Sequence, residues 1–348
     1  MPGKFLRELG VDHPIILAPM AGGAGSPELV AAVSNAGGLG SWGGGYSTPP
    51  QILDAAKQIR ALTSKPFAIN LFAGGYDVRP PVDSAPMLAL VSKAHAELGL
   101  PPPVLPPNPE NPFADQLAAV IEARPALFSF TFGIPSPDAL ARLRRAGIRT
   151  SGTATTVEEG RALAAAGVES IVAQGEEAGA HRGTFLNDFD KSMVPTLELT
   201  RGIAAAVPGV PIFASGGLMD GRDIVRALAA GADAAQLGTA FLVCPESGAA
   251  APYKHALMNA RQDTTVITRA YSGREARGLR NKFIDMTQGV PILPFRQQND
   301  LTRPMRNESG KQGLADYISL WAGRGVTRAR ATPAAELMKT LLVEIGRA

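Results

Sequence analysis

The chain has 348 residues, of which 45% are hydrophobic, 19% are charged and 38 are glycine. Such a composition belongs to a folded globular protein and excludes a chain that is disordered throughout. The 34 Lys and Arg residues exceed the 31 Asp and Glu residues by three, and this small excess predicts no nucleic-acid partner. Length alone allows one large α/β barrel or two ordinary domains, so the pattern along the chain must decide.

The cysteine content and the hydropathy of the chain indicate its cellular compartment. The single cysteine, Cys244, cannot form a disulfide within the chain, and no group of cysteines and histidines has the spacing of a zinc site. The first dozen residues carry charges throughout and lack the apolar segment of a signal peptide, and no run of 18 apolar residues follows. We therefore expect a cytoplasmic protein without a metal ion and without a membrane span.

Short β-rich runs alternate with Ala- and Leu-rich segments of helical period, which is the pattern of successive βα units. The predicted strands are residues 14–19, 38–42, 66–72, 126–132, 148–153, 169–174, 210–215 and 234–239. The predicted helices lie near residues 27–36, 49–62, 114–123, 137–146, 156–166, 195–206 and 220–230. Four of them end in a glycine that suits a left-handed cap, in the strings NAGGLG, RAGIRT, AAGVES and AAGADA. Eight strands at this length favour a TIM (β/α)8 barrel over one long open sheet, with a core at about residues 11–245.

Two stretches depart from this repeat. Residues 74–112 are rich in proline and follow the third strand, at the end of a barrel where active sites lie. The pattern allows either a lid or an inert surface excursion for this insertion. Residues 250–348 show helical patterns but no further βα unit, so we expect a C-terminal helical region packed on the barrel. The whole chain, residues 1–348, is then predicted to be a single domain.

Two glycine motifs follow the last two predicted strands: ASGGL at 214–218 and AQLGTAFL at 235–242. Barrels commonly bind a phosphate with the loops after strands seven and eight, where backbone N–H groups approach the anion. The residues placed to do so are Ser215, Gly216, Gly217, Gly238 and Thr239. A single glycine pair often forms only a tight turn, but paired motifs in adjacent units favour a phosphate site. Sugar-phosphate enzymes and flavin enzymes share this device, so it does not name the ligand.

Longer strings carry a resemblance to a known family. They are LAPMAGGAGSPELVAAVSNAGGLGSWGGG at 17–45, NLF at 70–72, AQGEEAGAHRGTF at 173–185, FASGGLMDGRD at 213–223 and AAQLGTAFL at 234–242. Together they resemble the nitronate monooxygenase family, formerly called 2-nitropropane dioxygenases. The resemblance covers roughly the first 245 residues, and SGREARGLRN at 272–281 extends it into the C-terminal region.

The resemblance implies a TIM barrel that binds FMN without a covalent bond. It also implies oxidation of alkyl nitronates, such as propionate 3-nitronate, with O2 to a carbonyl product and nitrite through a flavin semiquinone, as a detoxification. By similarity the flavin ring would contact Ala18, Pro19, Met20, Asn70, Gln174 and Gly179. The phosphate would be held by Gly217, Gln236, Leu237, Gly238 and Thr239, in agreement with the placement reached from the glycine motifs alone.

His181 is the candidate catalytic residue. The other three histidines lie before the first strand, in the insertion and in the C-terminal region, whereas His181 follows the sixth strand in the glycine-rich loop GAHRGTF. An imidazole with an ordinary pKa near 6.5 can accept a proton from a carbon acid or, when protonated, offset negative charge on a substrate. In the resembled family the matching histidine is the catalytic base where nitroalkanes are accepted. Whether this chain accepts neutral nitroalkanes or only preformed nitronates stays open.

Basic residues near this loop are candidates for the substrate. Arg182 follows the histidine directly, and Arg274 opens a basic run that continues through Arg277 and Arg280 to Lys282. We predict that Arg182 or Arg274 pairs with a substrate carboxylate. The alternative for the basic run is a solvated face.

Several rival functions share the barrel. An NAD(P)H:quinone reductase or an enoyl thioester reductase would use the same flavin site, and the lack of a GxGxxG fingerprint excludes neither. Inosine monophosphate dehydrogenase needs a cysteine after the sixth strand, whereas Cys244 follows the eighth in an apolar run that suits an inert thiol. A flavin-free barrel lyase, synthase or isomerase would hold a substrate phosphate instead. A non-catalytic flavin-binding barrel is the remaining alternative.

Overall fold

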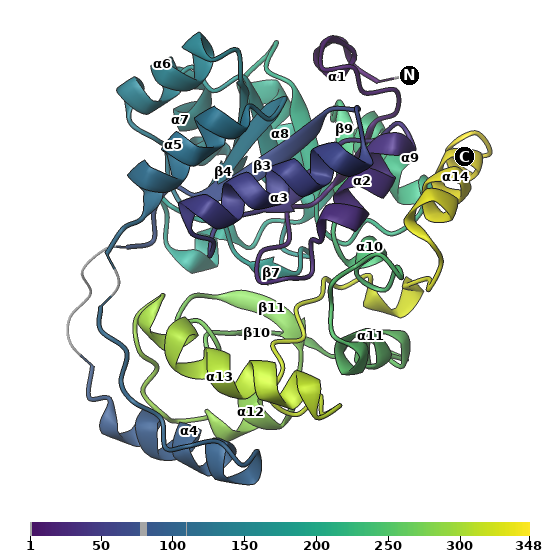
Figure 1. The fold of residues 1–348 in the computed structure, drawn as a ribbon. Helices are drawn as coiled ribbons and strands as arrows, with labels where there is room; N and C mark the ends of the chain where they lie inside the picture. The colour runs from purple at the N-terminus through teal and green to yellow at the C-terminus, as the bar shows by residue number, and fades with distance from the viewer. Residues whose placement is uncertain (1, 77–81, 109) are drawn as a thin grey trace.

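A computed structural model describes residues 2–76, 82–108 and 110–348. Its larger part is a barrel of eight parallel strands surrounded by helices (Figure 1). The barrel strands are β1 (Ile15–Leu17), β2 (Gly40–Gly43), β3 (Phe67–Phe72), β4 (Leu127–Thr131), β5 (Arg149–Ala154), β6 (Ser170–Gln174), β8 (Ile212–Ser215) and β9 (Ala234–Leu237). Neighbours follow the order β1-β9-β8-β6-β5-β4-β3-β2, and Leu39 closes the ring beside β2 through backbone bonds to Ile15 and Leu17. The predicted TIM barrel is confirmed.

The seven helices predicted between the strands are present. They are α2 (Pro27–Asn35), α3 (Pro49–Leu62), α5 (Phe113–Ala123), α6 (Pro137–Arg145), α7 (Val157–Ala165), α8 (Thr196–Ala206) and α9 (Gly221–Ala229). Local chemistry fixes where they begin: the side chains of Ser26, Ser136, Thr156 and Asp220 each accept a backbone N–H of the first turn. Four of them, α2, α6, α7 and α9, are followed by glycines with positive φ, Gly37, Gly147, Gly167 and Gly231, as the sequence predicts.

The eighth barrel helix comes from the end of the chain. Only the four-residue α10 (Thr239–Leu242) follows β9, and α14 (Ala334–Ile345) packs against both α9 and α2 (Figure 1). Its inner side chains Leu337, Met338 and Leu341 are at most 1% exposed and join the main core. The predicted C-terminal region thus packs on the barrel through α14, and the excursion of 96 residues that separates α14 from β9 hides from local patterns that this helix takes the place of an eighth barrel helix.

That excursion and the insertion after β3 form a smaller lobe below the barrel in Figure 1. Its elements are α4 (Ala85–Glu97), α11 (Ala251–Met258), β10 (Thr265–Thr268), β11 (Ala276–Leu279), α12 (Lys282–Met286) and α13 (Gln297–Lys311), with a short 3-10 turn at Val326–Arg328. The connection between β6 and α8 adds β7 (Ala180–His181), which pairs with β11, and carries a 3-10 turn at Phe189–Ser192. Met87 and Val91 of α4 share one apolar cluster with Tyr271, Phe283 and Met305. The described part of the predicted 74–112 insertion is thus a packed helix of this lobe, while residues 77–81 and 109 lie outside the described residues.

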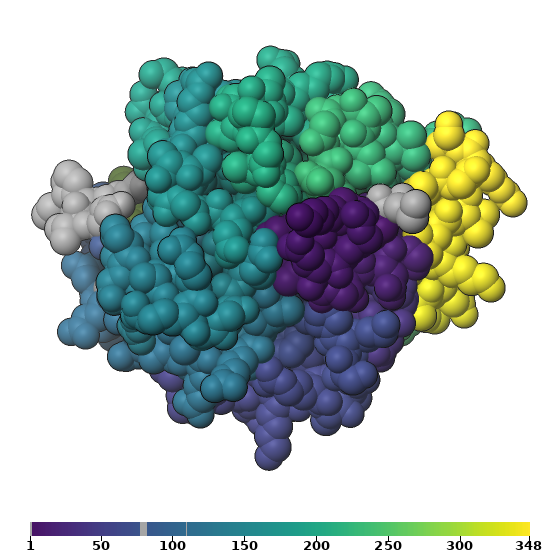
Figure 2. Space-filling model, turned by 90° about the horizontal axis from the view of Figure 1, so that it is seen from above, coloured from purple at the N-terminus to yellow at the C-terminus, as the bar shows by residue number. Residues whose placement is uncertain are grey.

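The lobe contains three strands that the sequence analysis did not predict. β10, β11 and β7 form an antiparallel sheet in which His181 pairs with Ala276. At the opposite end of the barrel, α1 (Lys4–Glu8) packs Phe5 and Leu6 against the starts of the strands, and Figure 2 shows this N-terminal segment on that face. The barrel is therefore covered at both ends, and the lobe with β7 lies at the catalytic end. In the part of the chain that is described, no helix is long and apolar enough to cross a membrane.

The packing of α14 predicts a large loss of stability when its core side chains are shortened. Leu337→Ala removes a side chain that is 1% exposed, so we expect the free energy of unfolding to fall by about 2–5 kcal/mol. Val343→Ala on the same helix is the matched control, because Val343 is 45% exposed and we expect a change below about 1 kcal/mol. Urea unfolding followed by circular dichroism measures both. Equal losses in the two variants would show that α14 is not part of the barrel core.

Candidate active site

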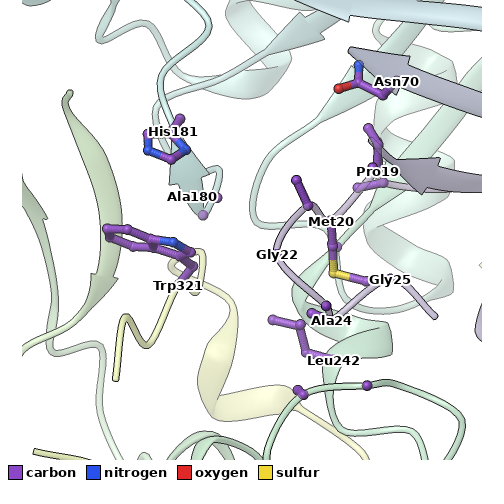
Figure 3. Close-up of a pocket in the computed structure, with 18 of the residues that line it drawn as sticks. Pro19, Met20, Gly22, Ala24, Gly25, Asn70, Ala180, His181, Leu242 and Trp321 are labelled. Atoms are coloured by element: carbon purple, nitrogen blue, oxygen red, sulfur yellow. The ribbon is translucent and has the colours of Figure 1, made fainter. Parts of the chain in front are cut away.

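A cavity of about 1150 Å³ lies between the carboxyl ends of the barrel strands and the smaller lobe (Figure 3). Ligand pockets usually measure about 300–1,000 Å³, so this one has room for a nucleotide-sized ligand and a small molecule beside it. The predicted site residues that line it are Ala18, Pro19, Met20, Asn70, Gln174, Gly179, His181, Ser215, Gly216, Gly217, Gln236, Gly238 and Thr239. Leu237 differs from them, because its side chain is 1% exposed and belongs to the barrel core.

The loops after β8 and β9 form a concave surface of backbone. Gly216 and Gly217 have φ of 137° and 68°, a region that favours glycine, and a Cβ on Gly217 would lie 2.9 Å from the Cβ of Glu177. Among the described residues, the N–H groups of Gly217 and Thr239 donate to no protein acceptor. Unpaired N–H groups on glycine loops suit an oxyanion such as a phosphate. The geometry therefore fits the phosphate site predicted from the glycine motifs.

A C-terminal segment, residues 321–330, covers these loops. Gly323 donates its N–H to Oγ1 of Thr239 at 2.9 Å, and the guanidinium of Arg328 donates to Gly217 O at 3.1 Å. The same guanidinium lies 2.8 Å from the carboxylates of Asp220 and Asp223 at the start of α9. Sequence reasoning missed this contact because more than 80 residues separate the partners. The segment holds the two glycine loops from outside.

His181 reaches the cavity from β7. Its Nε2 lies 2.8 Å from Oγ of Ser272, and the same Oγ lies 3.1 Å from Arg274 O. The contact with Ser272 fixes the plane of the imidazole and leaves Nδ1 without a protein partner among the described residues. The amide of Gln174 fixes the same loop from both sides, donating to His181 O at 2.9 Å and accepting from Gly183 N at 2.8 Å.

Aromatic rings surround the imidazole. The ring centroids of Phe72, Phe132, Phe295 and Trp321 lie 5.6–6.5 Å from that of His181. Burial among them, together with the positive charges of nearby arginines, lowers the pKa of His181 from 6.5 to about 3. The imidazole is thus neutral at physiological pH. Of the two states that the sequence allows for this imidazole, the neutral ring fits this site and the cation does not.

Strained backbone gathers around this histidine. Phe132, Ala180 and Arg296 have φ of 74°, 62° and 74°, a region that side chains rarely adopt, and each lies in or next to the group of rings around His181. The one further non-glycine residue with positive φ among the described residues is Arg124, at the end of α5 where helices often adopt this conformation. Such strain persists where the surrounding packing imposes it and is common at functional sites.

The structure places the two predicted substrate arginines away from the cavity lining. Arg182 is 1% exposed and donates to the carbonyls of Gln174 and Ser192 at 3.0 and 2.7 Å, so it braces the loop. Arg274 donates to Arg182 O at 3.2 Å and lies 3.9 Å from the centroid of the Phe132 ring. The cations that line the cavity are instead Arg303, Arg306 and Lys311 of α13, which sequence reasoning missed. The spacing of three between Arg303 and Arg306 on a helical pattern could have placed both on one face.

A (β/α)8 barrel whose strand-end cavity is lined by two glycine loops and a buried histidine has the features of a barrel enzyme. The sequence matches the family described as nitronate monooxygenase over residues 4–344. It is 42% identical to nitronate monooxygenase of Pseudomonas aeruginosa, with 99% of each chain covered. It is 38% identical to a probable nitronate monooxygenase of Staphylococcus aureus strain Newman, with 99% of this chain and 97% of the relative covered. The chain therefore belongs to the nitronate monooxygenase family, a family of flavoenzymes, and is an oxidoreductase.

Solved structures agree with this assignment. Nitroalkane oxidase from Streptomyces ansochromogenes is 38% identical and superimposes with a TM-score of 0.91 over 98% of both chains. FabK from Thermotoga maritima is 26% identical, with a TM-score of 0.77 over 100% of this chain and 97% of that one. The family resemblance drawn from the sequence strings is confirmed.

The neutral His181 predicts a specific pH dependence of stability. Below pH 6.5 the unfolded chain binds a proton at this imidazole, and the folded chain does so only near pH 3, so His181 lowers stability as pH falls through this window. Between pH 7.5 and 5.5 we expect the wild type to lose about 1.4 kcal/mol more than His181→Gln. Chemical unfolding at both pH values measures the difference, with the exposed His255→Gln as the control for substituting an imidazole. The same pH dependence in wild type and His181→Gln would mean that His181 is protonated in the folded protein.

Proposed function

We propose that the protein is an FMN-dependent nitronate monooxygenase that oxidises alkyl nitronates, such as propionate 3-nitronate, with O2 to a carbonyl product and nitrite. The observation that carries the proposal is that one cavity holds both the glycine cradle at Gly217 and Thr239 and the imidazole of His181. Family membership supplies the reaction class. We place the activity in the cytoplasm, where the buried free thiol of Cys244 stays reduced.

The residues present fit FMN. The N–H groups of Gly217 and Thr239 would hold its phosphate, and the chain from Ala18 to Met20 at the end of β1 would back the ring. Asn70 donates its Nδ2–H to Ser129 at 2.9 Å, and its amide oxygen faces the cavity in Figure 3, where it can accept a ring N–H. When bound, FMN supplies the transfer of electrons from substrate to O2, which no side chain of this cavity can perform.

The chain's own residues select the substrate's protonation state. A base with a pKa of about 3 takes a proton from a neutral nitroalkane only at a large free-energy cost. His181 can instead orient a substrate that is already a nitronate, because with Nε2 accepting from Ser272 the neutral ring carries its proton on Nδ1 and can donate it to a nitronate oxygen. The rings of Phe72, Phe132 and Phe295 exclude water around that position. We therefore propose preformed nitronates, and not neutral nitroalkanes, as the substrates.

A second candidate function is a reductase on the same scaffold. The enoyl reductase domain of MlnA from Bacillus amyloliquefaciens shares the overall fold at 11% identity, with a TM-score of 0.63 over 100% of this chain and 97% of that one, so the fold does not separate the two functions. The difference lies in the electron donor. A reductase takes electrons from a nicotinamide, whereas the proposed monooxygenase takes them from the nitronate itself.

Anaerobic mixing separates these functions. We expect propionate 3-nitronate to change the flavin absorbance of the purified protein within its turnover time, and NADH and NADPH to leave it unchanged. Admitting O2 should then restore the spectrum and release nitrite. Flavin bleaching by a nicotinamide alone would identify a reductase instead. A colourless protein without flavin absorbance would indicate the flavin-free barrel enzyme.

The glycine cradle predicts the effect of one added methyl group on cofactor affinity. Gly217→Ala places a Cβ 2.9 Å from Glu177 at a φ of 68°, so the loop must move, and we expect the Kd for FMN to rise by about tenfold or more. Gly209→Ala is the matched control, because Gly209 has a similar φ of 87°, open space around it, and a place in the turn before β8. Quenching of FMN fluorescence on adding back the cofactor measures both. An unchanged Kd for FMN in Gly217→Ala would show that this loop does not bind the phosphate.

A further inference from the structure

Two successive carbonyls of the loop after β8 are held by side chains that lie behind the loop. Oγ1 of Thr196, the first residue of α8, lies 3.1 Å from Gly216 O. Arg328, from the segment 321–330, donates from Nη2 to Gly217 O at 3.1 Å. Thr196 is buried behind the loop, and Arg328 reaches it from the protein surface, where its side chain is 44% exposed. Both carbonyls therefore point away from the cavity that the loop lines.

The direction of these carbonyls sets the direction of two N–H groups. In a planar trans peptide the C=O and the N–H point to opposite sides. Because Gly216 O faces Thr196, the N–H of Gly217 faces the cavity. Because Gly217 O faces Arg328, the N–H of Leu218 faces the cavity as well. Within the described residues neither N–H donates to a protein acceptor, and two adjacent N–H groups on one side form a concave site for an oxyanion.

Arg328 also compensates negative charge beside this loop. Its Nη1 lies 2.8 Å from a carboxylate oxygen of Asp220 and 2.8 Å from one of Asp223, both at the start of α9. The N–H of Met219 donates to Asp223 at 2.9 Å, which places this carboxylate next to the loop. A phosphate group carries a charge of about −1.5 to −2 at pH 7, so uncompensated carboxylates here would oppose its binding.

Two N–H groups at the start of α9 are already occupied by carboxylates of the chain itself. Gly221 donates to Glu344 at 2.8 Å, and Asp223 donates to Asp220 at 3.0 Å. Barrel phosphate sites commonly combine glycine loops with a helix N-terminus. In this chain negative charge occupies the helix start, so recognition of a phosphate depends on the orientation of the loop.

We propose that Arg328 is a positioning residue of the phosphate site, which turns the N–H of Leu218 into the cavity by holding Gly217 O and offsets the carboxylates of Asp220 and Asp223. This assignment rests on the proposed function, because it takes the phosphate to be that of FMN. One planar guanidinium reaches all three partners, with Nη1 between the two carboxylates and Nη2 at the carbonyl. A lysine ammonium is a single point charge and cannot reproduce this arrangement.

Two flavins that differ only in the phosphate test the assignment by binding, without turnover. FMN and riboflavin share the ring and the ribityl chain, and riboflavin lacks the phosphate. Each is titrated into the full-length protein after its flavin has been removed, and fluorescence quenching gives the Kd. The variants are Arg328→Gln and Arg328→Lys. Arg280→Gln is the matched control, because Arg280 is a half-exposed arginine that pairs with Asp285 at 2.6 Å in the smaller lobe.

We expect Arg328→Gln to raise the Kd for FMN by about tenfold or more, and to leave the Kd for riboflavin within about twofold of the wild type. Arg328→Lys keeps the charge and should show a smaller rise for FMN alone, whereas Arg280→Gln should bind both flavins as the wild type does. A merely structural role of Arg328 would weaken both flavins equally. That result, an unchanged Kd for FMN in Arg328→Gln, or a wild type that binds riboflavin as tightly as FMN overturns the proposal.

Folding and the proposed function are checked on the same samples. If Arg328→Gln does not fold, as judged by circular dichroism, Arg328→Lys decides: a rise for FMN alone supports the proposal, and a rise for both flavins or for neither overturns it. Nitrite release from propionate 3-nitronate is measured on the reconstituted wild type. A wild type that binds neither flavin contradicts the proposed function and this assignment with it. A wild type that binds FMN and releases nitrite, with an unchanged Kd for FMN in Arg328→Gln, overturns the role of Arg328 alone.

Discussion

Closure of the barrel is the constraint on which the site depends. The backbone bonds from Leu39 to Ile15 and Leu17 join the first two strands, so the carboxyl ends of all eight strands form one ring. Residues that are far apart in the sequence, such as Met20 and Thr239, then line one cavity. An open sheet would spread the same loops along an edge. The glycine loops after β8 and β9 and the residues at the end of β1 meet because the barrel sheet is closed and has no edge.

The position of α14 turns the smaller lobe into a fixed cover. Because α14 completes the ring of helices, the excursion between β9 and α14 is anchored to the barrel at both ends. β11 of this excursion pairs with β7, and that pairing sets the place of His181. α13 carries Arg306 from the same excursion. The smaller lobe therefore supplies both β11, which holds the strand of His181, and α13, whose cations line the cavity. The apolar core of the lobe fixes the distance between these two elements.

The sequence predicted what local patterns determine. Strands, helices and the glycine loops could be predicted because the features that determine them lie close together in the sequence. These features are hydrophobic periodicity, helix caps and turn glycines such as Gly217. Residues whose role depends on distant partners were missed: β7 has two residues and exists only through β11, and the cavity position of Arg306 follows from the packing of α13. Arg182 was chosen for its nearness to His181. Successive residues of a strand point to opposite sides, so the neighbour of a cavity residue faces away from the cavity.

The electrostatics of the cavity link these features to the choice of substrate. Arg306 attracts anions, and the same charge adds to the burial that holds His181 neutral. A cationic site of this kind disfavours a protonated histidine and thereby weakens the driving force for taking a proton from carbon. It favours a substrate that arrives with its negative charge already formed. Under the proposed function, proton abstraction and anion recognition compete within one cavity, and the burial of His181 among aromatic rings favours recognition.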